Sequence, residues 1–325
     1  MSTHLNIGVI GLGVMGQRML ARLAEHDRLR ASLVWDADPA ALARTLASYP
    51  ALQAAASAEA LIATPGLHSL YIATPPAAHM ALANQAFDAG LAVLCEKPLT
   101  VDFDAARATI DRIAREGRRA AVNFSLASSP GLQALQDAAR PGGLFGALAS
   151  VRIELAFAAW PRPWQAAAGA WLAERAEGGF SREVLSHFIF VLQRVLGPAT
   201  VLSARADYPD DGRSAERALT ARLVAGGVPV TVDARIGGEQ DDFNRMAWTG
   251  RDGEVALQGW FGVRLGRRAG GEWTDLGDAA TLRQRGQADQ LTQWVALIEG
   301  RPHTLPDFAE ALAVQATIEA LLAGR

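Results

Sequence analysis

Between residues 5 and 123, short apolar runs alternate with longer segments whose apolar residues recur at helical spacing. The apolar runs predict strands over residues 5–10, 31–36, 69–73, 92–95 and 120–123. The segments between them predict helices over residues 15–25, 39–48, 76–89 and 102–116. Strands and helices that alternate in this way build a parallel, doubly wound sheet with right-handed crossovers. We therefore expect an α/β domain over residues 1–124.

The pattern changes after Pro130, where apolar and polar residues alternate with a period of two. This alternation predicts strands within residues 144–157 and 199–267, with a clear hairpin across Gly226-Gly227. Helix-like segments are expected at residues 180–196, 288–299 and 307–323. Strands that follow an α/β half indicate an α+β domain over residues 125–325, with a large, mostly antiparallel open sheet. Its terminal helix is expected to pack back on the first domain.

A glycine-rich turn, Gly11-Leu12-Gly13-Val14-Met15-Gly16, follows the first predicted strand and opens the first predicted helix. In this setting a G-x-G-x-x-G turn is typical of a dinucleotide-binding Rossmann domain. Its glycines permit the tight turn, the approach of a pyrophosphate and close helix–strand packing, and the helix N-terminus attracts phosphate. Asp36 ends the next strand, twenty positions after Gly16. Its carboxylate suits an adenosine ribose and repels a 2′-phosphate, so the sequence predicts NAD in preference to NADP.

Composition narrows the class of protein. Of 325 residues, 50% are hydrophobic and 20% are charged, with a formal net charge of −3, as in an ordinary soluble globular protein. No Lys/Arg-rich block indicates nucleic acid, and no apolar run approaches membrane-spanning length. The single cysteine, Cys95, excludes an intrachain disulfide and a cysteine-based zinc site, and we predict no metal. Residues 1–4 lead directly into the first strand without a signal-peptide pattern, so we expect a cytoplasmic protein.

Three polar clusters stand where chemistry is expected. They are Thr74-Pro75-Pro76 with His79, Glu96-Lys97-Pro98, and residues 178–187. Ligands of open α/β sheets bind beyond the carboxyl ends of the strands, so the first two clusters lie where a nicotinamide is expected to reach. Glu183 and His187 in the third cluster are four residues apart, which makes them neighbours on one face of a helix.

The combination of GLGVMG, ATPPxxH, CEKPLT and a Gly-Gly pair followed by acid-x-x-x-His resembles the Gfo/Idh/MocA oxidoreductases over the whole chain. That family includes glucose–fructose oxidoreductase, inositol dehydrogenases and many sugar dehydrogenases. The resemblance implies a nucleotide domain followed by an open-sheet domain that lines the substrate site and often makes oligomer contacts. It also implies that Lys97 contacts the substrate hydroxyl and the nicotinamide ribose, that His187 is the general base, and that Glu183 orients or charges His187.

The chemistry of these residue types supports the same assignment. Oxidising an alcohol requires a base for the hydroxyl proton while hydride leaves the carbon, and neutral imidazole titrates near working pH. A lysine cation beside the oxygen stabilises developing alkoxide charge, and a carboxylate fixes the tautomer of the imidazole. We therefore predict hydride transfer between NAD and a hydroxyl-bearing carbon of a sugar, sugar acid or inositol-like polyol.

The predicted site draws residues from both domains. For the cofactor we expect Gly11, Leu12, Gly13, Val14, Met15, Gly16, Asp36, Thr74, Pro75, His79, Glu96, Lys97 and Asn123. For the substrate we expect Lys97, Asn123, Trp160, Arg162, Trp171, Glu183 and His187. Aromatic rings suit the C–H faces of sugars, and an arginine suits hydroxyls or a carboxylate.

These assignments have structural alternatives. Lys97 can be a surface lysine, and His187 can be a satisfied core histidine of an apolar helix. Glu183 can pair with Arg182 or another neighbour in a surface ion pair. Asn123 can simply form a turn. The tryptophan-rich segment 157–171 can cover the sheet or form an interface.

Four departures from the family pattern bear on the substrate more than on the reaction. Glu183 stands where aspartate is usual, Glu177 replaces the first of three glycines, Phe190 replaces a second acid, and Ser125 replaces a frequent arginine. Alternative functions are an NADPH-dependent reductase of a sugar carbonyl or imine, a non-catalytic NAD-binding regulator, and a hydrolase with a transient NAD redox step. The exposed face of the open sheet predicts a homodimer or homotetramer.

Overall fold

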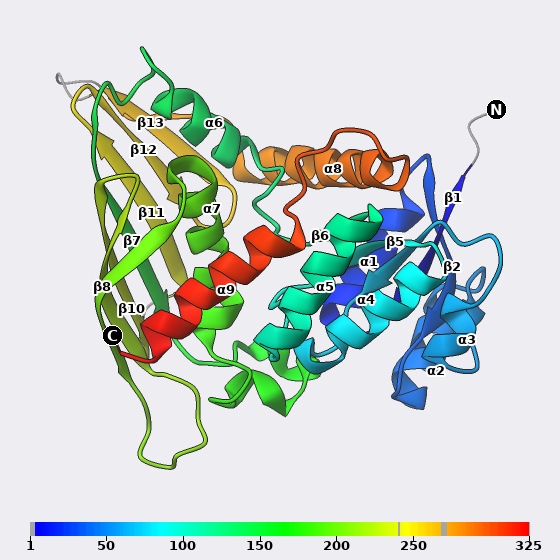
Figure 1. The fold of residues 1–325 in the computed structure, drawn as a ribbon. Coiled ribbons are helices and arrows are strands. Elements are labelled where there is room, and N and C mark those ends of the chain that lie inside the picture. The colour runs from blue at the N-terminus through cyan, green and yellow to red at the C-terminus, as the bar shows by residue number, and fades with distance from the viewer. Residues whose placement is uncertain (1–3, 240, 268–271, 325) are drawn as a thin grey trace. The chain divides into compact units, whose positions relative to one another are not determined.

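The computed structural model describes residues 4–239, 241–267 and 272–324. The chain divides into two compact units, whose helices and strands are labelled in Figure 1. The first comprises residues 1–124 and 290–312, and the second comprises residues 125–289 and 313–325. Two long helices, α8 (Ala279–Ile298) and α9 (Phe308–Leu322), contribute residues to both units.

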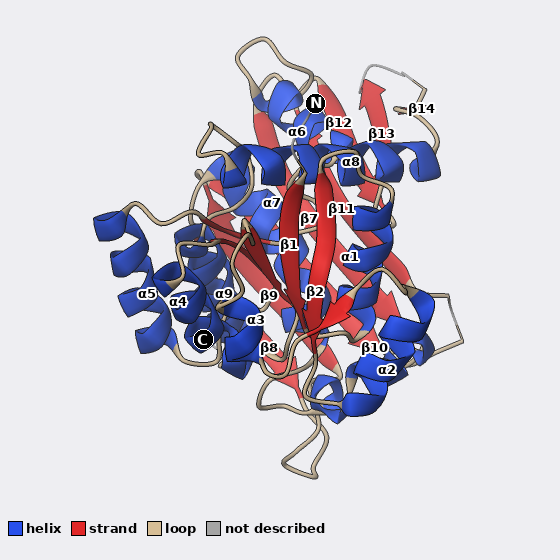
Figure 2. Cartoon of the chain, turned by 90° about the vertical axis from the view of Figure 1, so that its right-hand side faces the viewer, coloured by secondary structure: helices blue, strands red, loops and turns tan. Residues whose placement is uncertain are grey.

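The first unit is built on a six-stranded parallel sheet with the order β3-β2-β1-β4-β5-β6. Its strands are β1 (Leu5–Ile10), β2 (Leu29–Trp35), β3 (Gln53–Ala54), β4 (Ser69–Ile72), β5 (Ala92–Cys95) and β6 (Ala120–Val122). Its helices are α1 (Val14–Ala24), α2 (Pro39–Ser48), α3 (Ala58–Ile62), the 3-10 turn η1 (Pro76–Ala78), α4 (His79–Asp88) and α5 (Phe103–Glu116). β1 and β2 run side by side in the same direction (Figure 2). The predicted doubly wound α/β fold is confirmed.

Burial in the core of this unit explains why its strands appear in the sequence as apolar runs. β4 and β5 are buried along their whole length, as expected where helices cover both faces of a parallel sheet. α8 completes the core through the fully buried Trp294, whose indole N–H donates to the Ser69 hydroxyl at 3.1 Å. The sequence pattern did not predict β3, because its two residues are exposed and carry no apolar run.

The second unit is built on an eight-stranded sheet with the order β14-β13-β12-β11-β7-β10-β9-β8. Its strands are β7 (Leu148–Phe157), β8 (Ala199–Asp207), β9 (Ala218–Ala225), β10 (Val228–Ile236), β11 (Phe243–Gly250), β12 (Gly253–Gln258), β13 (Gly262–Arg267) and β14 (Thr274–Asp275). Its helical segments are α6 (Pro130–Ala139), the 3-10 turns η2 (Pro163–Ala168) and η3 (Ala170–Ala173), the π-helical turn η4 (Ser181–Leu185) and α7 (Ser186–Leu196). Only the β7–β10 ladder is parallel among the described ladders, so the predicted mostly antiparallel open sheet is confirmed.

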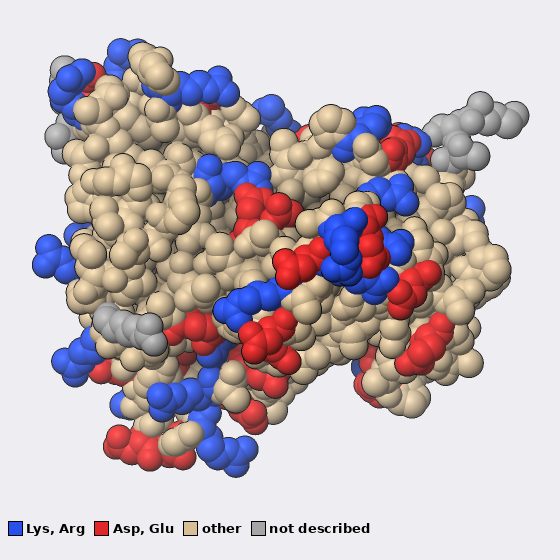
Figure 3. Space-filling model, viewed as in Figure 1, with Lys and Arg blue, Asp and Glu red and all other residues tan. Residues whose placement is uncertain are grey.

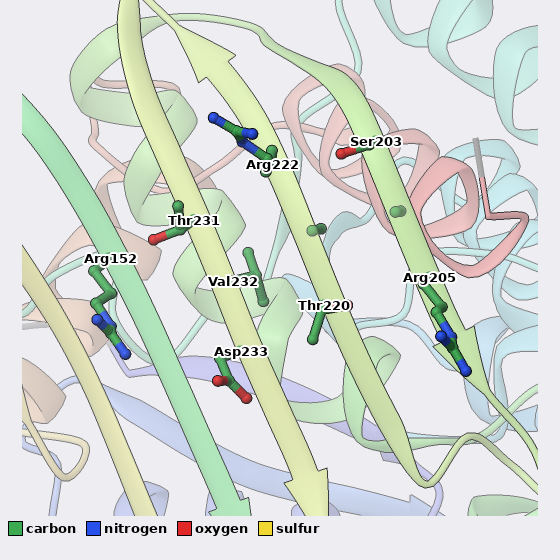
Figure 4. A pocket seen from close by; sticks show the side chains of 10 residues that line it. Arg152, Ser203, Arg205, Thr220, Arg222, Thr231, Val232 and Asp233 are labelled. Carbon is green, nitrogen blue, oxygen red and sulfur yellow. The ribbon is translucent and has the colours of Figure 1, made fainter.

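The two faces of this sheet differ in polarity. The inner face is apolar and packs against α6 and α7 (Figure 1). On the opposite, outer face, Figure 4 shows Arg152, Arg222, Arg205 and Asp233 among threonine and serine side chains around a pocket. The strict alternation of buried and exposed residues along β10 reflects this difference. The outer face is therefore polar rather than apolar.

Charges of both signs are interspersed on the face of the molecule seen in Figure 3. On α4 and α5, Arg112 pairs with Asp88 and with Glu116, and Arg112 and Arg118 lower the pKa of Glu116 to about 2. Among the described residues, every helix is too short or too polar to cross a bilayer.

Candidate active site

The structure distributes the predicted site residues over both units. The first unit holds Gly11–Gly16, Asp36, Thr74, Pro75, His79, Glu96, Lys97 and Asn123. The second unit holds Trp160, Arg162, Trp171, Glu183 and His187. Within the described ranges, no three His, Cys, Asp or Glu side chains gather to hold a metal ion.

The three glycines of the first turn meet different surroundings. Gly11 has a φ of +93°, and a Cβ added there would lie 2.4 Å from the backbone carbonyl of Ala73. A Cβ at Gly16 would lie 2.0 Å from the carbonyl oxygen of Gly11. A Cβ at Gly13 would have no atom within 4 Å. Gly11 and Gly16 are therefore required by the fold itself, whereas Gly13 borders open space.

The helix that follows this turn begins without a side-chain cap. Gly13 is the N-cap of α1, and the first turn of α1 contains no acidic residue. By contrast, the side chains of Asp38, Asp102 and Ser129 cap α2, α5 and α6. An uncapped helix start next to open space offers N–H groups and a partial positive charge to an anion. These residues fit the pyrophosphate of a dinucleotide.

Asp36 lies just beyond β2 and is tied to the glycine turn. One carboxylate oxygen accepts the Leu12 N–H at 2.6 Å, and the other accepts the Asp38 N–H at 2.8 Å. Each oxygen has a second lone pair, so the group can still accept ribose hydroxyls. The sequence did not draw attention to Arg44 on α2, whose guanidinium lies 3.7 Å from the Asp38 carboxylate. Its side chain is 71% exposed, which places a cation near this strand end.

His79 is fully buried at the start of α4 and connects two loops. Its Nε2 lies 2.9 Å from the carbonyl oxygen of Thr74, and its Nδ1 lies 3.1 Å from that of Leu99. Burial lowers the pKa of His79, although both carbonyls oppose that shift. The imidazole therefore joins the loop after β4 to the loop that carries Lys97.

Glu96 and Asn123 belong to a buried hydrogen-bond chain. Tyr71 and the Asn123 amide both donate to one carboxylate oxygen of Glu96. Gln290 donates to Asn123 and accepts from Arg22 at 2.8 Å. Burial, followed by the negative charge of Glu96, raises the pKa of Tyr71 well above its usual range. These contacts connect the ends of β5 and β6 with α1 and α8.

Lys97 follows Glu96 directly and is partly exposed. It is the one lysine in a sequence that contains 31 lysines and arginines in total, so arginine supplies every other such cation. Lysine presents a compact ammonium that can lose its proton, whereas arginine stays charged. Lys97 is thus the one amine side chain in the sequence, and it stands at the strand end for which chemistry is predicted.

Glu183 and His187 lie at the start of the helix predicted over residues 180–196. That helix begins with the π-helical turn η4, which contains Glu183, and continues as α7, which contains His187. π-Helical turns inside helices are frequent at functional sites. His187 is 4% exposed, and its ring centroid lies 5.0 Å from that of Trp260 with the rings at 89°. Trp260 was not predicted, because it stands alone in a turn.

The start of this helix is held by two charged residues, the partly buried Arg182 and the buried Glu216. Arg182 pairs with Glu319 through two hydrogen bonds of 2.7 and 2.8 Å, and donates to the carbonyls of Arg175 and Gly178. Glu216, which is 1% exposed, accepts the Ser181 N–H at 2.7 Å. Glu319 is therefore a carboxylate partner of Arg182.

Arg162 lies inside an aromatic cluster. Its guanidinium carbon lies 4.6 to 5.6 Å from the ring centroids of Trp164, Trp160 and Phe157. Its Nε donates to Gln165 at 3.0 Å, and the residue is 7% exposed. The Trp160 indole N–H donates to the carbonyl of Leu172 at 3.0 Å. These contacts organise the segment between β7 and η4 from within.

Comparisons with known proteins relate this architecture to characterised folds. Residues 5–124 match the model of the family described as "Oxidoreductase family, NAD-binding Rossmann fold". Inositol 2-dehydrogenase from Streptomyces avermitilis is 34% identical over 154 residues, which are 44% of this chain and 43% of that protein. The matched segments span 57% or less of the lengths of the curated relatives.

Two solved structures share the fold of nearly the whole chain. An oxidoreductase from Agrobacterium radiobacter, in complex with NAD+, L-tartaric acid and magnesium, has a TM-score of 0.85 at 20% identity, over 99% of this chain and 96% of that one. A 3-ketoreductase from Actinomadura kijaniata, in complex with NADP and TDP-benzene, has a TM-score of 0.81 at 19% identity, over 99% and 98%. Residues 5–124 therefore match the Gfo/Idh/MocA family of oxidoreductases, which the motifs of this chain resemble.

Proposed function

We propose that the chain is an NAD-dependent dehydrogenase that transfers a hydride between nicotinamide and a hydroxyl-bearing carbon of a sugar, sugar acid or inositol-like polyol. The observation that carries the proposal is the uncapped start of α1 at Gly13, beside Asp36, in a domain of this oxidoreductase family. The inositol 2-dehydrogenase among the curated relatives supports a polyol substrate.

The proposed chemistry assigns one role to each of three residues. Bound nicotinamide would accept the hydride that leaves the substrate carbon with the C–H bonding electrons. His187 takes the hydroxyl proton as the carbonyl forms, and Lys97 stabilises the negative charge that develops on the oxygen. Glu183 supports the imidazolium form of His187.

The loops of the first unit support this chemistry in the proposal. Thr74, Pro75 and Lys97 contact the cofactor. The buried side chains of His79, Glu96 and Asn123 hold in place the loops that carry these three residues. Trp160, Arg162 and Trp171 shape the substrate side, since the contacts of Trp160 and Arg162 order that segment.

NAD is the preferred cofactor in this proposal because the negative charge of Asp36 opposes a 2′-phosphate. The exposed guanidinium of Arg44 lies near Asp38, the residue next but one to Asp36, so NADP is the competitor that an experiment must include. One of the two solved structures is named as a complex with NAD and the other as a complex with NADP, so both cofactors are used in the experiment.

The proposed enzyme acts in the cytoplasm as a homodimer or homotetramer that forms through the outer face of the second sheet. Side chains of opposite sign on that face, such as Arg205 and Asp233, allow two copies to pair through polar contacts. Sedimentation at rising salt concentration tests this assembly, which should weaken as charges are screened.

A screen of sugars, sugar acids and inositols with NAD or NADP, followed by reduced-cofactor absorbance, tests the function. We expect turnover of at least one cyclic polyol with NAD, and loss of that turnover in both Lys97→Ala and Lys97→Arg with NAD affinity retained. NAD binding without turnover of any polyol supports a regulator instead. Reduction of sugar carbonyls with NADPH alone supports the reductase alternative.

A further inference from the structure

The inner face of the second sheet carries a buried amide oxygen that has no partner. Asn244 on β11 is 7% exposed, and within the described part of the chain its Oδ1 accepts no hydrogen bond. Native proteins pair nearly all such atoms, since an unsatisfied buried acceptor has lost its water and gained nothing in exchange. The Oδ1 of Asn244 is therefore left to accept a hydrogen bond from a group that the described residues do not supply.

Strand register places Asn244 on the inner face of the sheet, near the start of β11 and between β7 and β12. Side chains alternate along β11, so Asn244 shares the inner face with Met246 and Trp248, which are both fully buried. Across the sheet Asn244 pairs with Leu155 of β7, and its carbonyl accepts the Gly259 N–H at 3.0 Å beyond the end of β12. Trp260 follows Gly259 directly.

The helix that carries His187 touches this part of the sheet on both sides of β11. On the β7 side, the Phe180 ring lies 5.8 Å from that of Phe157. On the β12 side, the His187 ring lies 5.0 Å from that of Trp260. Because β11 lies between β7 and β12, Asn244 occupies the inner face between these two contacts.

We propose that Asn244 and Trp260 form a subsite for a hydroxylated ring next to His187. This subsite deepens the proposed function and rests on it, because it holds the ring whose hydroxyl group His187 would deprotonate. The partly exposed Trp260 supplies an apolar wall for ring C–H groups, and the Asn244 amide pairs with a ring hydroxyl. A hydroxyl donates and accepts, so it satisfies the amide in either orientation.

The subsite makes a prediction about which hydroxyl matters. A site built to pair with a hydroxyl discriminates against an analogue that lacks it, because the amide is then left unpaired. A water molecule at Asn244 would satisfy the same amide without touching the substrate. Removal of the amide would then affect every substrate alike.

Kinetics with NAD and two ring probes, myo-inositol and D-glucose, each with its monodeoxy analogues, separates these cases. For the probe that is turned over, we expect Asn244→Ala to lower kcat/KM by about 10- to 100-fold. The loss should vanish for the one analogue that lacks the contacted hydroxyl. Gln258→Ala, on the outer face of β12, is the control and should retain wild-type kinetics. An equal loss for parent and all analogues overturns the subsite.

Two variants test whether Trp260 forms a wall of the subsite. Trp260→Phe keeps an aromatic wall and should retain most of kcat/KM, whereas Trp260→Ala should raise KM more than it lowers kcat. Equal behaviour of both variants and wild type overturns the role of Trp260.

Binding measurements distinguish failure of the subsite from failure of the proposed function. Saturation-transfer NMR on the NAD-loaded protein detects myo-inositol or D-glucose without any turnover. If wild type turns over no compound of the screen but binds one probe, and Asn244→Ala weakens that binding, the subsite stands and the proposed function does not. If wild type oxidises a probe and Asn244→Ala changes neither binding nor kinetics, the subsite is wrong and the proposed function stands.

Discussion

Two helices of this molecule begin after glycines, and their starts are completed in opposite ways. At α1, Gly13 borders open space and no side chain caps the helix. At η4, which leads into α7, the carboxylate of Glu216 fills the equivalent position and accepts the Ser181 N–H. A Cβ added to Gly179 would lie 2.2 Å from that carboxylate. One helix start is left for an external anion, and the other is closed by an internal one.

This difference shows what a glycine before a helix does and does not indicate. Both segments read as glycine-rich turns into helices, and both helix dipoles favour a negative group. In the first unit no side chain caps the helix and its first turn has no acidic residue, and we expect the cofactor phosphates to supply the negative group. In the second it comes from Glu216, 35 residues beyond Ser181, where it fixes the start of the helix that bears His187.

Gly179→Ala should produce the largest effect on stability. The new methyl group meets the buried carboxylate of Glu216, at a φ of +97° that other residues rarely adopt. We expect a loss of about 3 kcal/mol in the free energy of unfolding, measured by urea denaturation, with NAD affinity unchanged. Unaltered stability would show that Glu216 does not fill this position.

Gly13→Asp tests the open helix start. A carboxylate at the N-cap should stabilise α1 and compete with the pyrophosphate, so NAD affinity should fall about 100-fold while stability is kept. Calorimetric titration with NAD measures the affinity. Wild-type affinity in this variant would mean that the cofactor phosphates bind elsewhere.

Asp36→Ser should shift cofactor preference by about 10-fold towards NADP, because the charge that opposes a 2′-phosphate is removed. The double variant Asp36→Ser/Arg44→Ala then reports whether Arg44 holds that phosphate. If preference stays the same in the single variant, Asp36 serves only to tie Leu12 and Asp38.

Glu216→Gln should give the smallest effect, seen in the pH dependence of stability. Burial raises the pKa of Glu216, so the folded protein binds this proton more tightly than the unfolded chain. The free energy of unfolding of wild type should therefore fall as pH rises from 4.5 through the raised pKa. Glutamine keeps an oxygen for the Ser181 N–H and cannot titrate. Its denaturation curves should lack this slope, and an identical slope in both proteins would contradict the assignment.

The parts of the fold that depend on local pattern could be predicted from sequence. The apolar runs of β4 and β5 and the alternation along β10 report burial directly, because each residue's neighbours along the strand show which faces are covered. β3 and the insertion of Trp294 into the first core could not be predicted in this way. Trp294 reaches Ser69 across 225 positions, and no local pattern encodes such a contact.

The same distinction between local pattern and long-range contact applies to the candidate site. The glycine turn, Asp36 and Lys97 stand in local motifs, so sequence reasoning found them. The contact of Trp260 with His187, and the position of Asn244 between β7 and β12, depend on the path of a helix and on the order of strands. The buried position of Arg162, in contrast to an arginine open to substrate, likewise depends on three aromatic rings that fold around it.

Transfer of deuterium tests the central claim most directly. The polyol with the highest turnover, deuterated on its ring carbons, is incubated with NAD and either wild type or Lys97→Arg, and the reduced cofactor is analysed by mass spectrometry. We predict deuterium in the NADH formed by wild type, and no NADH from Lys97→Arg despite unchanged NAD affinity. Reduced cofactor without deuterium, or equal turnover by Lys97→Arg, would contradict hydride transfer at a site that requires this single lysine.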